Sequence, residues 1–213
     1  MDIIYRDNDI VVLVKPSGVL SASDSSGAVS LPELIKKDLG VSEVFPIHRL
    51  DREVSGLMVY ALNKKAAADL SAQAADHTKF IKEYIALVEG CPEEESGILE
   101  DLLFKDSFKN KTFVVKRERR GVKKAKLSYT VLERLETGTL VRVKLYTGRT
   151  HQIRVQFASR KMPIVGDRKY GGSTGDKEIK LYSVALSFTH PTDRKMLSFE
   201  KIPNNLFVQT DKL

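Results

Sequence analysis

Residues 127–146 read LSYTVLERLETGTLVRVKLY, and this stretch decides the class of fold. Two runs of apolar and β-branched residues flank the polar segment 136–138, which contains a glycine. In the second run Val141, Val143 and Leu145 alternate with charged residues, which is the period of a strand that buries one face. The stretch therefore predicts a β-hairpin and, with it, an antiparallel sheet.

The rest of the chain shows further strand patterns and three helical ones. Strands are expected at 10–14, 56–62, 82–89, 127–134, 140–146, 181–188 and 196–200. Helices are expected after the capping residues Ser30, Asn63 and Thr150, and should end near residues 39, 75 and 160. Because the strands, about eight in number, come in runs, we expect an α+β fold with a mixed, mostly antiparallel sheet. Residues 1–213 should form a single domain, or two subdomains that share one sheet.

The composition limits the classes of protein to which the chain can belong. Of its 213 residues 42% are hydrophobic and 30% are charged, which is a globular and not a disordered composition. No apolar run is long enough for a membrane span, and the first residues do not resemble a signal peptide, so we expect a cytoplasmic protein with no membrane partner. The single cysteine, Cys91, excludes an intrachain disulfide, and its acidic neighbours disfavour a reactive thiolate.

Positive charge is concentrated in residues 105–126, which we call the basic segment. It holds ten basic and two acidic residues, a net charge of +8, whereas the whole chain has +7. Charge concentrated in this way favours a polyanionic partner. The candidate phosphate contacts are Arg119, Arg120, Lys123 and Lys124. A solvated basic hairpin without a ligand is the alternative interpretation.

Three aromatic residues, Phe104, Phe108 and Phe113, punctuate the basic segment. Aromatic rings among cations can stack on the bases of a single-stranded nucleic acid. Such residues are more often core residues of a strand, so stacking is the less favoured of the two interpretations.

Two other segments carry residues suited to chemistry. Residues 48–56 (HRLDREVSG) are expected on a loop that leads into a strand, and they offer the carboxylate of Asp51 among arginines. Residues 148–154 (GRTHQIR) are expected at a strand-to-helix turn, where Arg149 and the helix start suit an anion. If the segments meet, an arginine keeps Asp51 ionised, as a nucleophile or a base requires. A purely structural ion pair between the two loops is the alternative.

The histidines do not form a convincing metal site. His48, Asp51 and His151 match no standard ligand spacing, and arginines crowd both segments. Since neighbouring cations oppose the binding of another cation, we expect no metal.

Six short segments occur in one order from about residue 3 to residue 203. They are KPSG at 15–18, HRLD with SGL at 48–57, KEY at 82–84, GRTHQIR at 148–154, PIVGD at 163–167 and HP at 190–191. In this order and over this length, they make the sequence resemble the RluA-type family of RNA pseudouridine synthases. The resemblance implies a mixed, mostly antiparallel sheet with flanking helices and a central cleft that contains Asp51.

The resemblance also implies a reaction and residue roles. The family isomerises uridine in RNA to pseudouridine without cofactor or metal: the bond from N1 to the sugar breaks, the base turns, and C5 bonds to the same carbon. By resemblance, Asp51 is the essential carboxylate and Arg154 pairs with it. Tyr84 lies against the target base, and Arg49 lies near the space that the flipped base leaves. The expected partner is structured RNA, ribosomal or transfer, and the protein is expected to act as a monomer.

Some positions depart from the family pattern. Val54 stands where threonine is usual, Gln156 where histidine is common, and Tyr182 within Leu-Tyr-Ser where the family has Leu-His-Ala. These changes bear on contacts to the substrate, not on the reaction. The match begins near residue 3, so we expect none of the S4-type RNA-binding domain that many relatives carry. The alternative function is a non-catalytic RNA-binding module that uses the basic segment, and a metal-dependent RNA hydrolase is a second rival.

Overall fold

The computed structural model describes residues 1–25, 27–173 and 178–203. The described elements, in chain order, are β1 (Asp2–Arg6), β2 (Ile10–Lys15), α1 (Leu31–Leu39), β3 (Phe45–Pro46), β4 (Ser55–Ala61), α2 (Lys64–Ala75), β5 (Ile81–Val88), β6 (Ser96–Asp106), β7 (Lys111–Val115), β8 (Val122–Leu135), β9 (Gly138–Leu145), α3 (Gln152–Ala158), β10 (Leu181–Thr189) and β11 (Met196–Glu200). Each expected strand is present. The expected number of strands was too low, because β1, β3, β6 and β7 were not predicted.

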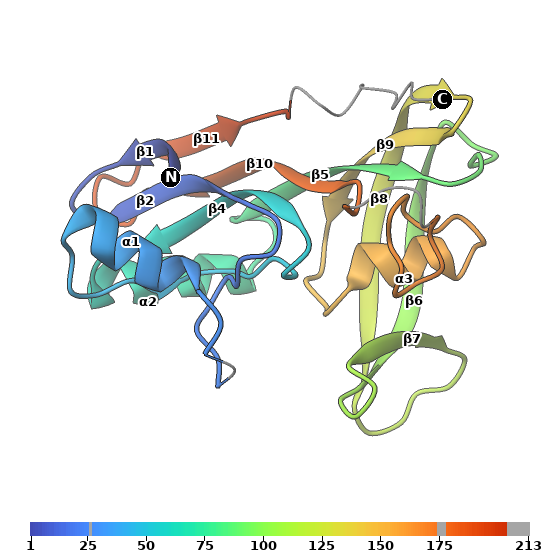
Figure 1. Ribbon diagram of the computed structural model, residues 1–213, viewed down its shortest axis with the longest axis horizontal. Helices are drawn as coiled ribbons and strands as arrows, with labels where there is room; N and C mark the ends of the chain where they lie inside the picture. Colours follow the sequence, from blue (N-terminus) through green and yellow to red (C-terminus); the bar gives the residue numbers. More distant parts are fainter. Residues whose placement is uncertain (26, 174–177, 204–213) are drawn as a thin grey trace.

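The described strands form one sheet, which is shown in Figure 1. Its order is β1-β2-β4-β10-β5-β9-β8-β6-β7, with β11 paired to β10 and β3 paired to β4. β4 and β10 run parallel, whereas the other strand pairs are antiparallel. The expectation of an α+β fold with a mixed, mostly antiparallel sheet is therefore confirmed.

The parallel pair depends on one glycine. Gly56, at the start of β4, has φ +119°, and a Cβ atom on it would lie 2.2 Å from the backbone oxygen of Ser183 in β10. Only glycine permits this conformation and this close approach of two backbones. The loop that carries Asp51 therefore joins the sheet at a fixed point, beside β10.

Two of the three helices begin as expected. Ser30 and Glu33 form a capping box at the start of α1, and Gly40 ends that helix in the left-handed conformation. The side chain of Asn63 accepts a hydrogen bond from the Ala66 backbone N–H at 2.9 Å and caps α2. These caps satisfy backbone N–H groups that a helix end leaves without partners.

The prediction that Thr150 caps α3 is wrong. The residue at the cap position is His151, whose φ of +53° is left-handed, and its side chain makes no capping hydrogen bond. The carbonyl of Thr150 instead accepts a hydrogen bond from the hydroxyl of Thr112 in β7 at 3.0 Å. The turn is thus fixed by a contact with another strand, which local sequence does not show.

The helices divide between the two faces of the sheet. Leu31 and Ile35 of α1 and Phe157 of α3 belong to the largest hydrophobic cluster, whereas Leu70 of α2 packs in a second cluster. Along β4 alternate residues contribute to these two clusters, as expected for a strand buried on both faces. α1 and α3 therefore share a face, and α2 covers the opposite one.

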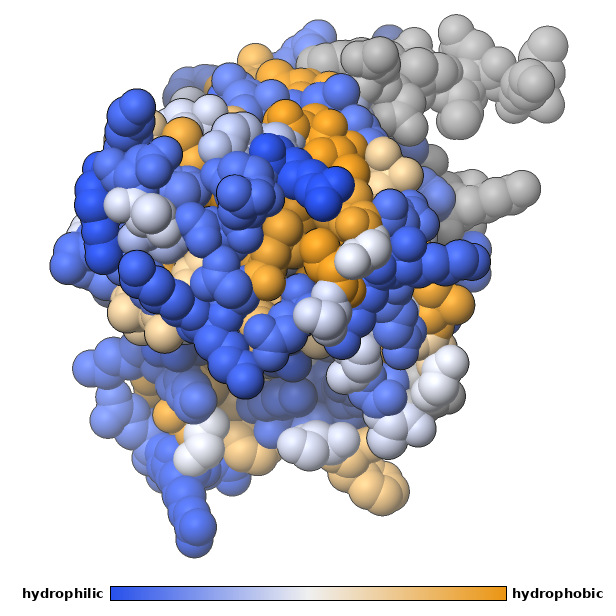
Figure 2. Space-filling model, turned by 90° about the vertical axis from the view of Figure 1, so that its left-hand side faces the viewer, coloured by the Kyte–Doolittle hydropathy of each residue, from blue (hydrophilic) through white to orange (hydrophobic). Residues whose placement is uncertain are grey.

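Figure 1 shows β6 and β8 descending past α3 to β7, away from the half of the molecule that holds α1 and α2. At the other extreme, Figure 2 shows an apolar area framed by hydrophilic residues on the side that carries the β1 edge of the sheet. Two exposed apolar residues at this end are Ile3 of β1 and Met196 of β11, and neither lines the cavity described below.

Within the described residues, no helix combines the length and apolarity needed to cross a bilayer.

Candidate active site

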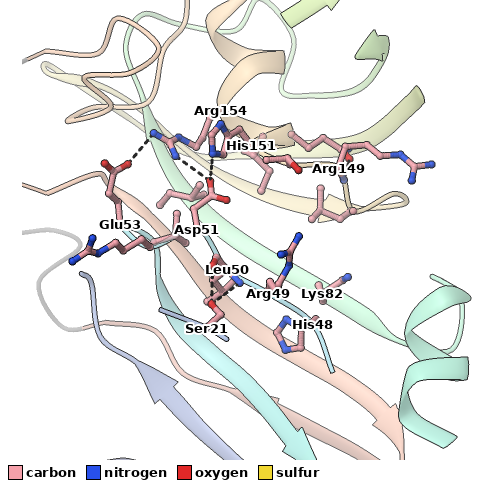
Figure 3. Close-up of a pocket in the computed structure, with 18 of the residues that line it drawn as sticks. Ser21, His48, Arg49, Leu50, Asp51, Glu53, Lys82, Arg149, His151 and Arg154 are labelled. Carbon is pink, nitrogen blue, oxygen red and sulfur yellow. Dashed lines mark hydrogen bonds and ion pairs between the residues drawn. The ribbon is translucent and has the colours of Figure 1, made fainter. Parts of the chain in front are cut away.

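A cavity of about 690 Å³ is formed by segments from both halves of the sheet. Its lining comes from the loops at 20–24 and 47–54, strand β5, the turn at 148–154 and the turn after β6. The two segments singled out from the sequence thus meet in one cleft, as Figure 3 shows. The volume is within the usual range for a small-ligand site.

Asp51 and Arg154 are in direct contact. The Nη1 atom of Arg154 donates to Oδ2 of Asp51 at 3.0 Å, and Nε2 of His151 lies 3.9 Å from the same oxygen. In the described part of the chain, no hydrogen bond is made to the other oxygen, Oδ1. The side chain of Asp51 is 25% exposed. One carboxylate oxygen is therefore held while the other remains open to a ligand.

Arg154 is fixed mainly by Asp167. Its Nε and Nη2 atoms donate to the two oxygens of Asp167 at 2.7 Å each, and Nη2 also donates to Glu53 at 3.0 Å. The Arg154 side chain is 2% exposed and that of Asp167 is fully buried. Burial opposes the charge of Arg154, but the hydrogen bonds and charge of Asp167, followed by those of Asp51, raise its pKa. Arg154 therefore stays positively charged, and its bidentate hydrogen bonds to Asp167 hold the guanidinium group in place.

His151 closes this side of the cleft. Its Nδ1 atom is 2.8 Å from the hydroxyl of Tyr170, and that hydroxyl also accepts from the backbone N–H of Thr112 at 2.8 Å. Burial lowers the pKa of His151, and the charge of Asp51 only partly offsets this effect. A neutral His151 between Asp51 and Tyr170 fits a bracing role.

Tyr84 lies in β5 and lines the same cavity. It is 5% exposed, and its pKa is raised by burial, with a further contribution from the charge of Asp51. The phenol therefore keeps its proton at neutral pH and can donate it in a hydrogen bond. A planar ligand in the cavity would therefore meet an aromatic side chain close to the Asp51 carboxylate.

The far side of the cavity carries cations without carboxylate partners. Figure 3 shows Glu53 and Lys82 on opposite sides of Asp51, with Arg49 and Arg149 also toward the Lys82 side. Lys82 is 7% exposed, its Nζ atom lies 5.6 Å from the centre of the Phe80 ring, and among the described residues it makes no hydrogen bond or ion pair. Burial lowers its pKa. Arg49 likewise makes no ion pair within the described ranges, and the guanidinium group of Arg149 donates to a backbone carbonyl, that of Lys124, at 3.0 Å.

Two histidines and a glycine complete the Lys82 side. Burial and the charge of Lys82 lower the pKa of His48 to about 3, so its ring is neutral, and its Nε2 atom accepts from the Val59 backbone N–H at 3.3 Å. The buried Nδ1 atom of His77 has no hydrogen-bond partner among the described residues. A Cβ atom on Gly148 would lie 3.7 Å from both Lys82 Nζ and His77 Cε1. Glycine at 148 therefore leaves the Lys82 ammonium group accessible from the cavity.

An acidic group on this side is Asp76, whose charge acts on His77. Its Oδ1 atom accepts from the Thr78 hydroxyl at 2.7 Å, and its Oδ2 atom lies 3.5 Å from Lys79. Since Asp76 is already engaged, it does not neutralise Lys82. The far side of the cavity is suited to an anion.

The structure places the four basic-segment candidates outside the cavity. Arg119 lies over the ring of Phe104 at 4.6 Å, and Lys124 is 3.5 Å from Glu118. Arg120 and Lys123 are exposed and form no ion pair with any described residue. The basic segment is thus not one uniform surface, because two of its four candidates already have partners.

Four residues at the site were missed as candidates in the sequence. Lys82 was quoted only as part of KEY, although it is two residues before Tyr84 and so faces the same side of the strand. Asp167 was quoted only within PIVGD, and nothing in that pattern indicates its contact with Arg154. The other two are Lys105 and Asn110, which line the cavity from the end of β6 and the turn after it.

The departures from the family pattern are accommodated by packing. Val54 is 2% exposed, and Tyr182 belongs to a hydrophobic cluster with Val184. The side-chain amide of Gln156 donates to the Leu99 carbonyl at 3.1 Å and to Asp101 at 2.8 Å. Gln156 and Tyr182 do not line the cavity.

In the described ranges, no group of three or more histidine, cysteine, aspartate or glutamate residues is placed to hold a metal ion. Asp51 and Glu53, two carboxylates that line the cleft, are instead engaged by Arg154.

Residues 9–159 match the family model described as RNA pseudouridylate synthase. An uncharacterised RNA pseudouridine synthase of Aquifex aeolicus is 38% identical, with 94% of this chain and 68% of that protein covered. A tRNA pseudouridine synthase C of Haemophilus ducreyi is 33% identical over 90% of this chain and 86% of its own length. A ribosomal large subunit pseudouridine synthase C of Buchnera aphidicola is 31% identical over 89% of this chain and 63% of its own length.

The fold is similar to that of a solved human protein. Human RNA pseudouridylate synthase domain containing 1 superposes with a TM-score of 0.78 at 24% identity, covering 96% of this chain and 83% of the human one. At this identity the likeness concerns the fold alone, and it agrees with the mixed sheet described above.

Proposed function

Because the chain belongs to the RNA pseudouridylate synthase family, we propose that it converts specific uridines of structured RNA into pseudouridine. Membership makes it an RNA-modifying isomerase: the product has the same atoms as the substrate, joined through a different atom of the base. Ribosomal and transfer RNA are both named for relatives, and we extend both to this chain as candidate substrates. We place this activity in the cytoplasm, in a single domain that acts as a monomer.

One observation carries the proposal: a carboxylate held by one oxygen at the wall of a nucleotide-sized cavity. Arg154 fixes Asp51 Oδ2 at 3.0 Å, while Oδ1 has no partner in the described chain. A charged oxygen that is open to the ligand suits a nucleophile or a base. Since Asp167 holds Arg154 on two atoms, the arginine can orient Asp51 without covering it.

Tyr84 and Arg49 are proposed to receive the extruded nucleotide. Extruding a uridine from a stack costs a few kcal/mol. Stacking on an aromatic ring offsets about 1–3 kcal/mol of this cost, and Tyr84 offers such a face beside Asp51. Arg49, exposed and without an ion-pair partner among the described residues, is proposed to enter the space left by the base, where a guanidinium group can both stack and donate hydrogen bonds.

Phosphate binding is proposed for the Lys82 side of the cavity and for the basic segment. Arg149 and Lys82 supply charge that no described carboxylate neutralises, so a backbone phosphate would complete this side of the site. Arg119, Arg120, Lys123 and Lys124 are proposed to hold phosphates farther along the RNA, with a contribution that depends on salt and not on sequence.

The first test is a map of modified sites. The purified protein is incubated with total RNA that lacks pseudouridine, and new pseudouridines are located by chemical labelling and primer extension. Asp51→Asn should reduce turnover by at least about 10⁴-fold and leave RNA affinity within severalfold. The matched control is Glu53→Gln, which removes another carboxylate bound to Arg154 but one whose side chain is 60% exposed; it should retain turnover.

Each rival predicts a different map. A non-catalytic RNA-binding module gives tight RNA binding with no new pseudouridine for either protein. A metal-dependent RNA hydrolase gives cleaved RNA and loses activity with a chelator. Turnover that survives in Asp51→Asn would remove Asp51 from the proposed role.

A further inference from the structure

Phe108 is an unusually exposed aromatic residue. It is 99% exposed. The next most exposed large hydrophobic residues in the described chain are Met196 at 65% and Ile98 at 60%. Phe108 lies in the turn that joins β6 to β7. Because it buries no area, the Phe108 side chain contributes little to folding, and both faces of its ring are open to a ligand.

The turn itself holds the ring outward. Asp106 Oδ1 accepts the backbone N–H of Lys109 at 3.0 Å, and Asn110 adopts a left-handed conformation with φ +45°. Asparagine tolerates this conformation better than most residues. Phe108 thus stands at the apex of a hydrogen-bonded turn with no described residue packed against it.

The same turn borders the active site. Lys105 and Asn110, on either side of the apex, line the cavity that contains Asp51. In β7 the hydroxyl of Thr112 bonds to the Thr150 carbonyl at 3.0 Å, and its N–H bonds to the Tyr170 hydroxyl that contacts His151. These contacts tie the hairpin to the wall of the cavity, so the apex lies near its rim.

The charge around the apex suits RNA. Lys105, Lys109 and Lys111 surround Phe108 in sequence, and the one nearby acid, Asp106, is used to close the turn. The other two aromatic residues of the segment differ from Phe108: Phe104 is covered by Arg119 at 4.6 Å, and Phe113 has Lys111 at 5.9 Å. Of the three rings, Phe108 is the one that is free on both faces.

We propose that Phe108 stacks on an unpaired RNA base beside the uridine that enters the cavity. The proposal rests on the proposed function, because it takes RNA as the ligand of the cleft. Stacking at the rim would hold open the part of the RNA from which the uridine leaves, and the neighbouring lysines would contact its phosphates. The extruded base and its neighbour would then have separate aromatic partners, Tyr84 inside the cavity and Phe108 at its rim.

The test compares two RNA probes, a stem-loop with a loop of about eight uridine-containing nucleotides and a fully paired duplex of the same length. Phe108→Ala should weaken binding to the stem-loop by about 5- to 100-fold and binding to the duplex by less than twofold. Phe108→Trp should restore the affinity, whereas Phe108→Leu, apolar but without a ring, should not. Because the side chain is 99% exposed, each variant should unfold at the parent temperature.

Lys109→Ala is the matched control one residue away. It should lower the slope of affinity against salt by about one unit, whereas Phe108→Ala should leave that slope unchanged because stacking releases no counterions. Parent-like affinity in Phe108→Ala, or full rescue by leucine, would overturn the proposal. The binding assays do not depend on turnover, so a failure of Asp51→Asn to stop the reaction would refute the catalytic role of Asp51 without deciding this one.

Discussion

The two sides of the cavity use charge in opposite ways. On the Asp51 side, Arg154 is shared among three carboxylates, those of Asp51, Glu53 and Asp167. On the Lys82 side, cations line the wall and no described carboxylate neutralises them. Both sides contain a buried cation, with Arg154 at 2% and Lys82 at 7% exposure. The comparison shows that burial alone does not indicate what a charge does.

The difference has an energetic consequence. Removing one partner of a buried ion pair leaves the other charge without compensation, which is strongly destabilising. A buried cation without a carboxylate partner, such as Lys82, already carries much of this cost, which its contact with the Phe80 ring only partly offsets, so its removal should relieve it. The same kind of substitution should therefore change the free energy of unfolding in opposite directions on the two sides.

Arg154→Met should have the largest effect. It leaves the fully buried Asp167 without its two hydrogen bonds from the guanidinium group, and we expect a loss of about 3–5 kcal/mol in the free energy of unfolding. Turnover should also be lost, since Asp51 loses its hydrogen bond from Nη1. Denaturant unfolding measures the first effect and the pseudouridine assay the second.

The double variant Arg154→Met/Asp167→Asn is the control for this interpretation. It removes both buried charges, so it should recover part of the lost stability without recovering turnover. If the double variant is no more stable than Arg154→Met, the cost arises from packing and not from the uncompensated charge of Asp167.

The sequence could predict features that depend on local pattern but not those that depend on long-range contacts. Local pattern was enough to predict the hairpin at 127–146 and the helix caps Ser30 and Asn63. The structure contains all three. Strand β6 was not predicted, because Glu100, Asp101 and Lys105 interrupt its short apolar runs. Its stability comes from pairing with β8 over nine residue pairs, and such long-range contacts are not visible in a single strand.

The candidate site likewise contains some contacts that the sequence could predict and others that it could not. The contact of Asp51 with Arg154 was expected by resemblance, and the two side chains are in fact bonded. Asp167 is the main residue that holds Arg154, and it reaches Arg154 because the turn after α3 folds back. No rule of sequence spacing predicts that arrangement. For Lys82, the alternation of β5 could place it beside Tyr84 but could not show that it has no carboxylate partner among the described residues.

Lys82→Met should show the opposite sign from Arg154→Met. Removing a buried cation that has no carboxylate partner, only the ring of Phe80 at 5.6 Å, should raise the free energy of unfolding at pH 7 by about 1 kcal/mol. RNA affinity should fall by about tenfold, and the salt slope by about one unit, because one phosphate contact is lost. A variant that is less stable and binds RNA normally would show that Lys82 serves packing.

The pH dependence supplies an independent check on Lys82. Burial lowers its pKa in the folded state, so between that value and the ordinary lysine pKa the unfolded chain binds more protons than the folded one. Stability of the parent should therefore rise with pH in this interval. The stability advantage of Lys82→Met should narrow as the pH approaches the ordinary lysine value, and an advantage that stays constant would contradict the assigned cause.

The smallest effects are expected in the basic segment, where the same comparison can be made between exposed residues. Arg120 and Lys123 have no ion-pair partner in the described chain, whereas Arg119 stacks on Phe104 and Lys124 is near Glu118. The double variant Arg120→Ala/Lys123→Ala should lower the salt slope of RNA binding by about two units. Arg119→Ala/Lys124→Ala should lower it by less, since both side chains already interact with the protein. Equal changes would mean that RNA displaces those partners, and no change in either variant would place the RNA away from the basic segment.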